Sequence, residues 1–277
     1  MVVFLNGGFV AKEQALVPVG DRGFLLGDGL FETARVVNGR PIRFAQHLER
    51  LARGADFLKI KMPFTPEQFQ QFAAQLIQQN QMPESILRLT LTRGPGGRGY
   101  SQAKESRPTV VMTLQPLPPT ANPTGWKLIT SSFRISAGDP LASFKTTSKI
   151  RHVLARAEAV ERGADEALLL NTNGEVAETA GGNLFWINRG EVCTVPVACG
   201  ILPGVTRAVV LEICETLGLN IAERIVKPGV LKSCQGIFIT QSVFGVVPVT
   251  TFNGEPVASP PLMERIIRAY LELLLRP

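Results

Sequence analysis

Apolar residues recur along this chain with two periods, and these predict strands and helices in alternation. Segments rich in β-branched and aromatic residues and bounded by glycine, asparagine or proline predict strands. In the first half of the chain these segments cover residues 2–5, 9–11, 31–37, 86–92 and 109–114. Asn38-Gly39 follows the third segment and predicts a tight hairpin, because both residues readily adopt positive φ angles.

Two helices are predicted between these strands. Residues 43–57 carry apolar side chains at three- and four-residue spacing. These side chains are Leu48, Leu51, Ala52 and Ala55. A second helix is expected over residues 66–80, because Thr65 suits the N-cap and Pro66 suits the first helical position.

A proline-rich stretch marks the best domain boundary. Residues 116–123 contain four prolines, which neither a helix nor a central strand tolerates. We therefore expect a smaller N-terminal α/β domain over residues 1–117, a linker over 118–124, and a larger C-terminal domain over 125–277.

The second half repeats the mixture of elements. Its predicted strands cover residues 126–129, 167–170, 175–178, 184–187 and 192–195. Helices are predicted after Lys145 and over residues 205–217 and 262–275. The first of these helices carries on one face Ile150, Val153, Leu154 and Ala157. With no internal repeat, the pattern predicts an α+β fold, a two-domain α/β chain in segregated halves.

The composition excludes several functions. The chain has 277 residues, 45% of them hydrophobic, which is enough for one large or two medium cores. Its formal net charge is +6, but Lys and Arg are scattered among acidic residues, so we expect no nucleic-acid partner. No apolar run approaches the roughly 18 residues that span a membrane. The N-terminus lacks the basic region of a signal peptide, which favours a soluble, cytoplasmic protein without a membrane partner.

Metal binding is not expected either. The four cysteines form no CxxC pair, and the two histidines, His47 and His152, lie far from them in sequence. This spacing is typical of reduced thiols in a reducing compartment.

Three segments of the second half are candidates for chemistry. Lys145 lies between Phe144 and a run of hydroxyl residues, where desolvation would favour the neutral amine that imine formation needs. Glu178 ends a predicted strand and precedes small residues, over which a flat cofactor could lie. Residues 204–207 open a helix, whose exposed N–H groups and Thr206 hydroxyl can bind an anion. Each has an ordinary interpretation, as a surface lysine, a solvated glutamate and a common helix start, but their combination favours a pyridoxal-phosphate site.

Two basic segments of the first half could bind the anionic parts of a ligand. Arg50, on the predicted helix over residues 43–57, could contact a phosphate through two nitrogens, although such a residue is commonly solvated. Residues 93–101 are glycine-rich but lack the Gly-Lys-Ser/Thr ending of a Walker loop, and no GxGxxG follows the first strand. We interpret this segment as a loop that presents Arg98 and Tyr100 to an anionic ligand.

Together these segments resemble the fold-type IV pyridoxal-phosphate enzymes, also called class IV aminotransferases. The resemblance runs from residues 21–33, DRGFLLGDGLFET, to residues 245–249, GVVPV. It implies pyridoxal 5′-phosphate as cofactor, Lys145 as the Schiff-base lysine and Glu178 as the partner of the pyridine nitrogen. It also implies a homodimer with the active site near the interface, which the loop over residues 93–101 would cross. The phosphate ligands that it implies are Arg50, Val205, Thr206 and Ser242.

Within this family three features are similar to the 4-amino-4-deoxychorismate lyases. Residues 96–101, GGRGYS, resemble the lyase loop, whereas D-amino-acid aminotransferases typically have a histidine where Tyr100 stands. Residues 240–249 are similar to the lyases' version of that segment. Lys149 adds a cation for a substrate with two carboxylates, although it could equally be a solvated helix residue. The resemblance places at the substrate Phe31, Thr33, Arg98, Tyr100 and Lys149.

The expected function is a lyase that converts 4-amino-4-deoxychorismate to 4-aminobenzoate and pyruvate, a step toward folate. A class IV aminotransferase is the first alternative, because Glu32 and the aromatic position of Phe31 are shared with transaminases. Phe31 replaces a tyrosine of the D-amino-acid enzymes, and Ile150 replaces a tyrosine of the branched-chain enzymes, so both branches are less favoured. A pyridoxal-phosphate-binding protein without turnover is the second alternative.

Overall fold

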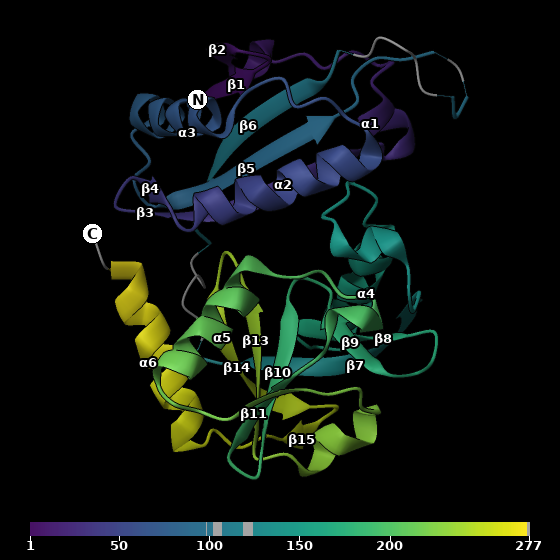
Figure 1. Cartoon of the computed structure of the whole chain (residues 1–277), viewed down its shortest axis with the longest axis vertical. Helices are drawn as coiled ribbons and strands as arrows, with labels where there is room; N and C mark the ends of the chain where they lie inside the picture. The colour runs from purple at the N-terminus through teal and green to yellow at the C-terminus, as the bar shows by residue number, and fades with distance from the viewer. Residues whose placement is uncertain (98, 102–106, 119–123, 276–277) are drawn as a thin grey trace. The chain divides into compact units, whose positions relative to one another are not determined.

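The structure, a computed structural model, describes residues 1–97, 99–101, 107–118 and 124–275, and the chain divides into two compact units (Figure 1). Unit 1 comprises Met1–Pro119 and Phe144–Ser148, and unit 2 comprises Thr120–Ser143 and Lys149–Pro277. The predicted linker, 118–124, lies almost wholly outside the described residues. Helices and strands occur in comparable proportion, which confirms the predicted α+β class.

Unit 1 is built on a six-stranded antiparallel sheet with the order β2-β1-β6-β5-β3-β4. Its strands are β1 (Val2–Leu5), β2 (Gly8–Ala11), β3 (Gly29–Val37), β4 (Arg40–Pro41), β5 (Ser85–Thr92) and β6 (Thr109–Pro116). Its helices are α1 (Arg22–Leu26), α2 (Phe44–Leu58) and α3 (Pro66–Asn80). Apolar residues of α2 and α3 join those of the sheet in one core.

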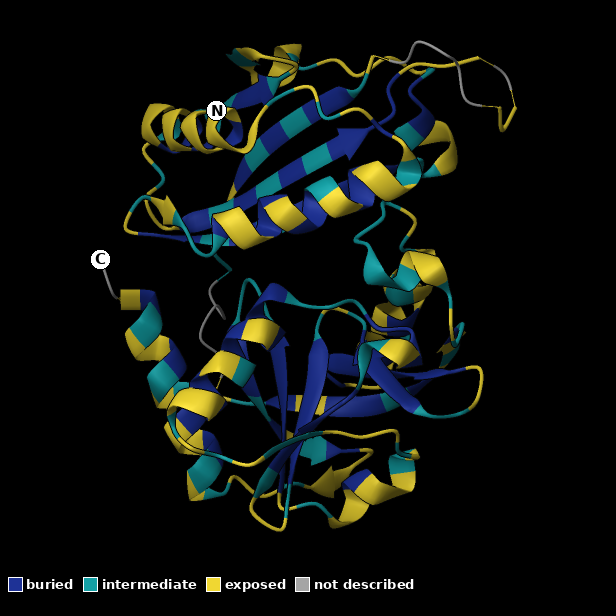
Figure 2. Cartoon of the chain, viewed as in Figure 1, coloured by how far each residue is buried: buried dark blue, intermediate teal, exposed yellow. Residues whose placement is uncertain are grey.

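The two faces of this sheet differ, because successive side chains of a strand point to opposite sides. On β3 the side chains of Leu30, Glu32 and Ala34 are buried, whereas those of Phe31 and Thr33 are partly exposed. The same alternation runs along β5 and β6 (Figure 2). We call the partly exposed side the open face; it carries both predicted substrate residues of β3.

Local sequence signals in unit 1 act as predicted. The Thr65 hydroxyl accepts from the Gln68 amide (3.3 Å), and the Gln68 side chain accepts from the Thr65 amide (2.9 Å). This reciprocal pair is a capping box, and it fixes the start of α3. Asn38 and Gly39 have φ angles of 50° and 77° and connect β3 to β4, which confirms the predicted hairpin.

Unit 2 holds a nine-stranded sheet that closes on itself. Its strand order is β12-β11-β10-β13-β14-β7-β8-β9, β15 pairs with β14, and β9 also pairs with β10. The strands are β7 (Trp126–Ile135), β8 (Glu166–Asn171), β9 (Val176–Thr179), β10 (Asn183–Asn188), β11 (Glu191–Thr194), β12 (Ile221–Glu223), β13 (Gly236–Gln241), β14 (Gly245–Phe252) and β15 (Glu255–Pro256). The helices are α4 (Ile150–Glu161), α5 (Val205–Thr216) and α6 (Pro261–Leu275).

Helix α4 forms where the sequence predicts it, but its marked apolar face is exposed. Ile150, Val153 and Leu154 are 67%, 59% and 41% exposed. The residues that α4 buries are Ala155 and Ala159, whose small side chains let the helix lie close to β7 and β8. The spacing of the large apolar residues therefore identified the helix but not the side that packs.

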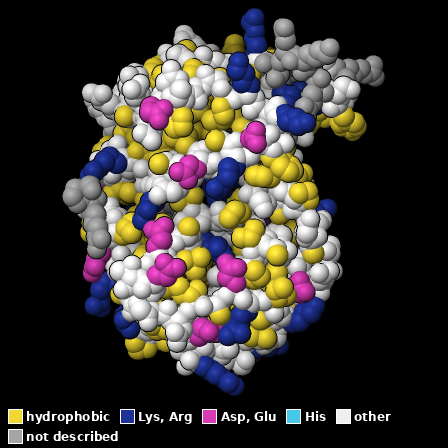
Figure 3. All heavy atoms as spheres, in the orientation of Figure 1, with side chains coloured by type: hydrophobic (Ala, Val, Ile, Leu, Met, Phe, Trp, Pro, Cys, Tyr) yellow, Lys and Arg dark blue, Asp and Glu magenta, His cyan; other side chains and the backbone are white. Residues whose placement is uncertain are grey.

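Three general properties of the described residues bear on function. No helix among them combines the length and apolar character that a membrane crossing requires. Nowhere in the described part of the chain do three or more His, Cys, Asp or Glu side chains gather as metal ligands would. Cationic and anionic side chains are interspersed on the face that Figure 3 shows, without a continuous basic patch there.

Candidate active site

The backbone of Lys145 is fixed to unit 1 beside the start of β3. The Phe31 amide donates to the Lys145 carbonyl (2.9 Å), and the Thr147 amide donates to the Gly29 carbonyl (2.9 Å). The Thr147 hydroxyl adds a bond to the carbonyl of Gly27 (2.8 Å). These bonds fix the Cα of Lys145, so the side-chain torsions alone position its amine.

The Lys145 amine and the Arg88 guanidinium both lie against the Phe31 ring. Lys145 Nζ is 4.6 Å and Arg88 Cζ is 4.0 Å from the ring centroid, which are cation–π distances. Arg88 lies on β5 opposite Thr33. Burial lowers the pKa of Arg88. A partly desolvated guanidinium beside the candidate amine favours an anionic ligand on the open face.

Arg88 was not predicted from the sequence, because the sequence of a strand does not distinguish a functional arginine from a solvated one. Two features of the sequence bear on Arg88. Apolar and polar residues alternate along β5, and an antiparallel order of successive strands implies that β5 pairs with β3. Neither feature fixes the register, and the register is what brings Arg88 opposite Thr33.

Arg50 belongs to a buried cluster and is not the solvated residue that a helix surface would hold. Its Nε and Nη2 donate to the two oxygens of Glu32 (2.8 and 2.7 Å), and His47 Nδ1 lies 2.7 Å from Glu32 Oε2. Burial would raise the pKa of Glu32, but the hydrogen bonds and charges of Arg50 and His47 outweigh burial and lower it to about 2. Burial also lowers the pKa of His47, with a smaller contribution from the charge of Lys145. The ionised Glu32 therefore orients the Arg50 fork, whose contact with phosphate stays a prediction.

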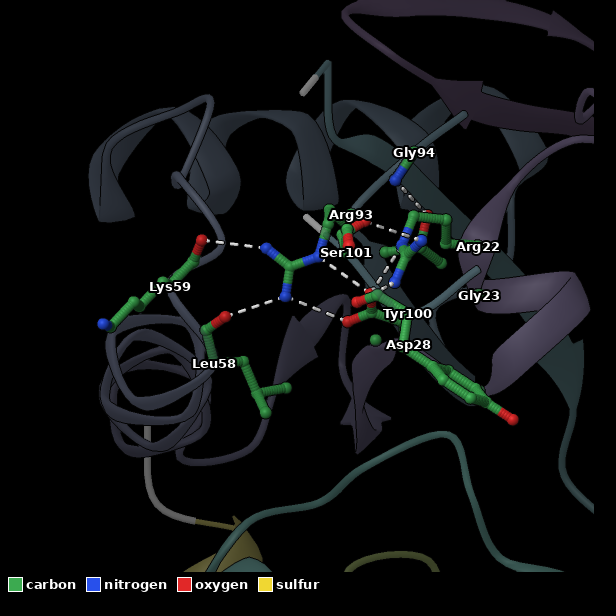
Figure 4. Close-up of polar contacts among 12 residues, drawn as sticks. Arg22, Gly23, Asp28, Leu58, Lys59, Arg93, Gly94, Tyr100 and Ser101 are labelled. Atoms are coloured by element: carbon green, nitrogen blue, oxygen red, sulfur yellow. Dashed lines mark hydrogen bonds and ion pairs between the residues drawn. The ribbon is translucent and has the colours of Figure 1, made fainter. Parts of the chain in front are cut away.

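Arg22 of α1 holds the loop that is predicted to meet the substrate by hydrogen bonds to residues 99–101 (Figure 4). Arg22 Nη1 donates to the carbonyls of Gly99 (3.0 Å) and Ser101 (3.4 Å), and Nη2 donates to that of Tyr100 (3.5 Å). The Tyr100 side chain is 89% exposed. Arg98, the other predicted substrate contact of this loop, lies outside the described residues.

Asp28 joins this anchor to the rest of unit 1. One carboxylate oxygen accepts from Arg22 Nε (2.9 Å) and from Arg93 Nε (2.8 Å), and Arg93 also donates to the carbonyls of Leu58 and Lys59 (2.8 and 3.0 Å) at the end of α2. Burial would raise the pKa of Asp28, but the two guanidinium groups outweigh it and lower that pKa. The loop is thus held by a charged cluster that stays ionised at neutral pH.

In unit 2, Glu178 lies where β9 meets β10 and the sheet closes. It is 6% exposed, so it is not the solvated turn residue that its sequence context also allowed. Its Oε1 lies 2.9 Å from His152 Nε2, and its Oε2 accepts from the Leu202 amide (2.8 Å). Each carboxylate oxygen has a second lone-pair direction, so Glu178 can also accept an N–H from a cofactor ring.

The backbone N–H groups at the N-terminus of α5 can bind an anion. Gly204 is the N-cap, no side chain caps the helix, and the first residues Val205 and Thr206 are buried. Uncapped N–H groups and the helix dipole together favour a phosphate there. Two other predicted residues of unit 2 are partly exposed, Lys149 at the N-cap of α4 and Ser242 in the turn after β13.

The predicted residues are thus distributed over both units. Unit 1 holds Phe31, Thr33, Arg50, Tyr100 and Lys145. Unit 2 holds Lys149, Glu178, Val205, Thr206 and Ser242. By chemical type, the amine in unit 1 matches the aldehyde of pyridoxal phosphate. In unit 2, the buried carboxylate and the backbone N–H groups at the start of α5 match its ring nitrogen and its phosphate.

This fold and these groups define a fold-type IV pyridoxal-phosphate enzyme. The family model described as "Amino-transferase class IV" matches residues 29–252, a span that includes both Lys145 and Glu178. The chain belongs to that family, which confirms the resemblance seen in the sequence.

Relatives in this family carry several different names. A Methanocaldococcus jannaschii protein provisionally named branched-chain-amino-acid aminotransferase is 34% identical, over 92% of this chain and 88% of its own. A Bacillus licheniformis D-alanine aminotransferase is 30% identical, over 94% and 91%. The solved 4-amino-4-deoxychorismate lyase of Pseudomonas aeruginosa superposes with a TM-score of 0.87 at 28% identity, over 98% of each chain.

Proposed function

We propose that the chain is a pyridoxal-phosphate-dependent lyase that converts 4-amino-4-deoxychorismate to 4-aminobenzoate and pyruvate. The observation that carries the proposal is the central row of the open face, in which Thr33, Arg88 and Thr113 are neighbours on three strands. A guanidinium between two hydroxyl residues suits a polar dicarboxylate better than an aliphatic side chain. The full-length likeness to a solved lyase supports the same assignment.

Pyridoxal phosphate is the cofactor, and when bound its ring acts as an electron sink. Lys145 Nζ would hold the cofactor at rest and, when free, would take the proton from the substrate carbon that bears the amine. The resulting ammonium can return this proton to the departing enolpyruvate. The products together contain every atom of the substrate, so no water, oxidant or reductant is consumed.

The remaining residues bind and orient. Glu178 accepts the N–H of the cofactor ring, and Arg50, Val205, Thr206 and Ser242 bind the phosphate. In this proposal Arg88 binds one substrate carboxylate, and Arg98 and Lys149 bind the other. Thr33 and Tyr100 orient the ring.

A class IV aminotransferase is the second candidate, and the sequence relatives favour it. The relatives from Methanocaldococcus jannaschii and Bacillus licheniformis, 34% and 30% identical to this chain, carry aminotransferase names. A transaminase must accept an amino acid and a 2-oxo acid in turn, and each has one carboxylate that Arg88 could bind equally well.

One parallel assay separates these candidates. The cofactor-loaded protein receives freshly generated aminodeoxychorismate in one tube, and D-alanine or L-leucine with 2-oxoglutarate in two others. We expect 4-aminobenzoate and pyruvate in equal amounts, lost with Lys145→Ala. Glutamate formation without 4-aminobenzoate would instead assign a transaminase, and bound cofactor without any turnover would assign a binding protein.

We also propose that the chain acts as a homodimer with the active site near the interface. The support within unit 1 is a run of exposed apolar side chains around α1, which includes Phe24, Leu25 and Leu26. The exposed Tyr100 side chain suits a loop that reaches a partner's site.

A further inference from the structure

The Glu178 carboxylate is held on both of its oxygens. His152 Nε2 lies 2.9 Å from Oε1, and because an ionised carboxylate only accepts, the imidazole is the donor. The Leu202 amide donates to Oε2 over 2.8 Å. The side chains of His152 and Glu178 are largely buried, which shields these bonds from water. The carboxylate therefore cannot rotate without breaking one of them.

We propose that His152 is a positioning residue, which acts through Glu178 to fix the orientation in which this carboxylate receives the ring N–H of the cofactor. The inference rests on the proposed role of Glu178. Both the neutral Nε2–H tautomer and the imidazolium can donate from Nε2 to the Glu178 carboxylate. His152 itself is assigned no contact with substrate or cofactor.

The backbone of Leu202 extends this hold toward the start of α5. Its N–H binds Glu178, and its carbonyl accepts from Asn183 Nδ2 (2.8 Å), so the peptide groups on both sides of the Leu202 Cα are fixed. Asn183 lies opposite Glu178 where the sheet closes. A Cβ on Gly204 would lie 2.1 Å from Asn183 Oδ1, so the backbone at Gly204 packs tightly against the Asn183 side chain. Helix α5 begins at the next residue, Val205. A displaced Glu178 would therefore disturb the helix start as well.

The chain offers a matched control on the same helix. One turn after His152, Arg156 of α4 pairs with the buried Glu166 of β8 (3.0 Å). Both pairs join a basic side chain of α4 to a buried glutamate of the sheet. Arg156→Ala removes the second pair and leaves Glu178 with both of its donors, so it reports what a loosened α4 does by itself.

The test is the affinity of the apoprotein for pyridoxal phosphate, together with the absorption spectrum of the bound cofactor. His152→Ala is expected to weaken binding about 10-fold and to shift the spectrum, as loss of one supporting hydrogen bond does at other sites. His152→Gln, whose amide nitrogen can take the place of Nε2, is expected to stay within about 3-fold of wild type. In a Glu178→Gln background, His152→Ala should add no further loss, because the two residues act in series.

Three outcomes would overturn the inference. His152→Ala could match wild type in affinity and spectrum, Arg156→Ala could weaken binding as much as His152→Ala, or the His152 effect could persist undiminished beside Glu178→Gln. A different result separates the underlying proposal: if Glu178→Gln alone changes neither affinity nor spectrum, the role of Glu178 is wrong, and the role of His152 fails with it. Thermal unfolding of each apoprotein shows that the variants are folded.

Discussion

At the scale of single residues, the carboxylate of Glu32 is the hydrogen-bond partner of two buried basic side chains, Arg50 and His47. It receives two hydrogen bonds from Arg50 and lies within hydrogen-bond distance of His47, and all three side chains are buried. Replacing Glu32 by Gln would leave the Arg50 charge buried without its counter-ion. Breaking such a pair typically costs about 3–5 kcal/mol. We expect a loss of this order in the free energy of unfolding of the apoprotein, measured by urea titration at pH 7.

The pH dependence of the same variant gives an independent check. The pKa of Glu32 is about 2 in the folded chain, against an ordinary value of 4.5, so its stabilising contribution is complete above about pH 4.5 and is lost as the pH falls toward 2. This contribution is on the order of 3 kcal/mol. The difference in free energy of unfolding between wild type and Glu32→Gln should therefore decrease as the pH falls from 5 to 3. A difference that stays constant over this range would contradict the assignment.

At the scale of elements, α1 anchors the loop over residues 99–101, which is predicted to meet the substrate, through the side chain of Arg22. Arg22 donates to three successive loop carbonyls and to Asp28 (Figure 4). A lysine keeps the charge but lacks the planar fork, so it cannot serve these acceptors together. For Arg22→Lys we expect about a 10-fold higher KM for the substrate, with kcat within about 3-fold, because roughly 1.4 kcal/mol of loop ordering is lost.

Two measurements accompany the KM determination for this variant. Amide hydrogen exchange at residues 99–101 should accelerate, since these residues lose the donor that holds their carbonyls. Arg151→Lys, at an exposed arginine of α4, is the control and should change neither quantity. If Arg22→Lys leaves both exchange and KM at wild-type values, the anchor has no role in substrate binding.

Elements whose limits are set by local chemistry could be predicted from the sequence. Helix α3 begins at Pro66 as expected, because Thr65 and Gln68 form its capping box from within the segment. Helix α1 was missed, since five residues carry too little periodicity to recognise. The side of α4 that packs against the sheet could not be predicted from the sequence either. It depends on small alanines and on ion pairs with glutamates that lie apart in the sequence.

The residues of the candidate site also differ in how far the sequence predicts them. Lys145 and Glu178 could be named from their motifs, because a motif fixes residue type and order. Arg88 and His152 were not predicted, since the roles proposed for them come from pairing: Arg88 through the register of β5 on β3, and His152 through its contact with Glu178 where the sheet closes. Long-range register is not encoded in any short segment, so it has to be seen in the fold.

At the scale of the whole molecule, the proposed homodimer rests on exposed apolar residues of unit 1. Within residues 16–26 of unit 1 the side chains of Leu16, Val19, Phe24, Leu25 and Leu26 are all exposed. Single exposed apolar residues are ordinary, but a run of this length is more typical of an interface than of free surface. The homodimer proposed above would cover it.

Phe24→Asp tests that proposal directly. A carboxylate at the centre of an apolar interface would be buried without a partner, so we expect the variant to sediment as a monomer at micromolar concentration where wild type sediments as a dimer. Ile225→Asp adds the same charge at an exposed apolar position of unit 2 and should leave the dimer intact. A wild-type monomer, or a Phe24→Asp dimer of unchanged affinity, would show that this surface is not the interface. Loss of activity together with dissociation would place the working site at the junction of two chains, since Phe24 itself is assigned no part in the chemistry.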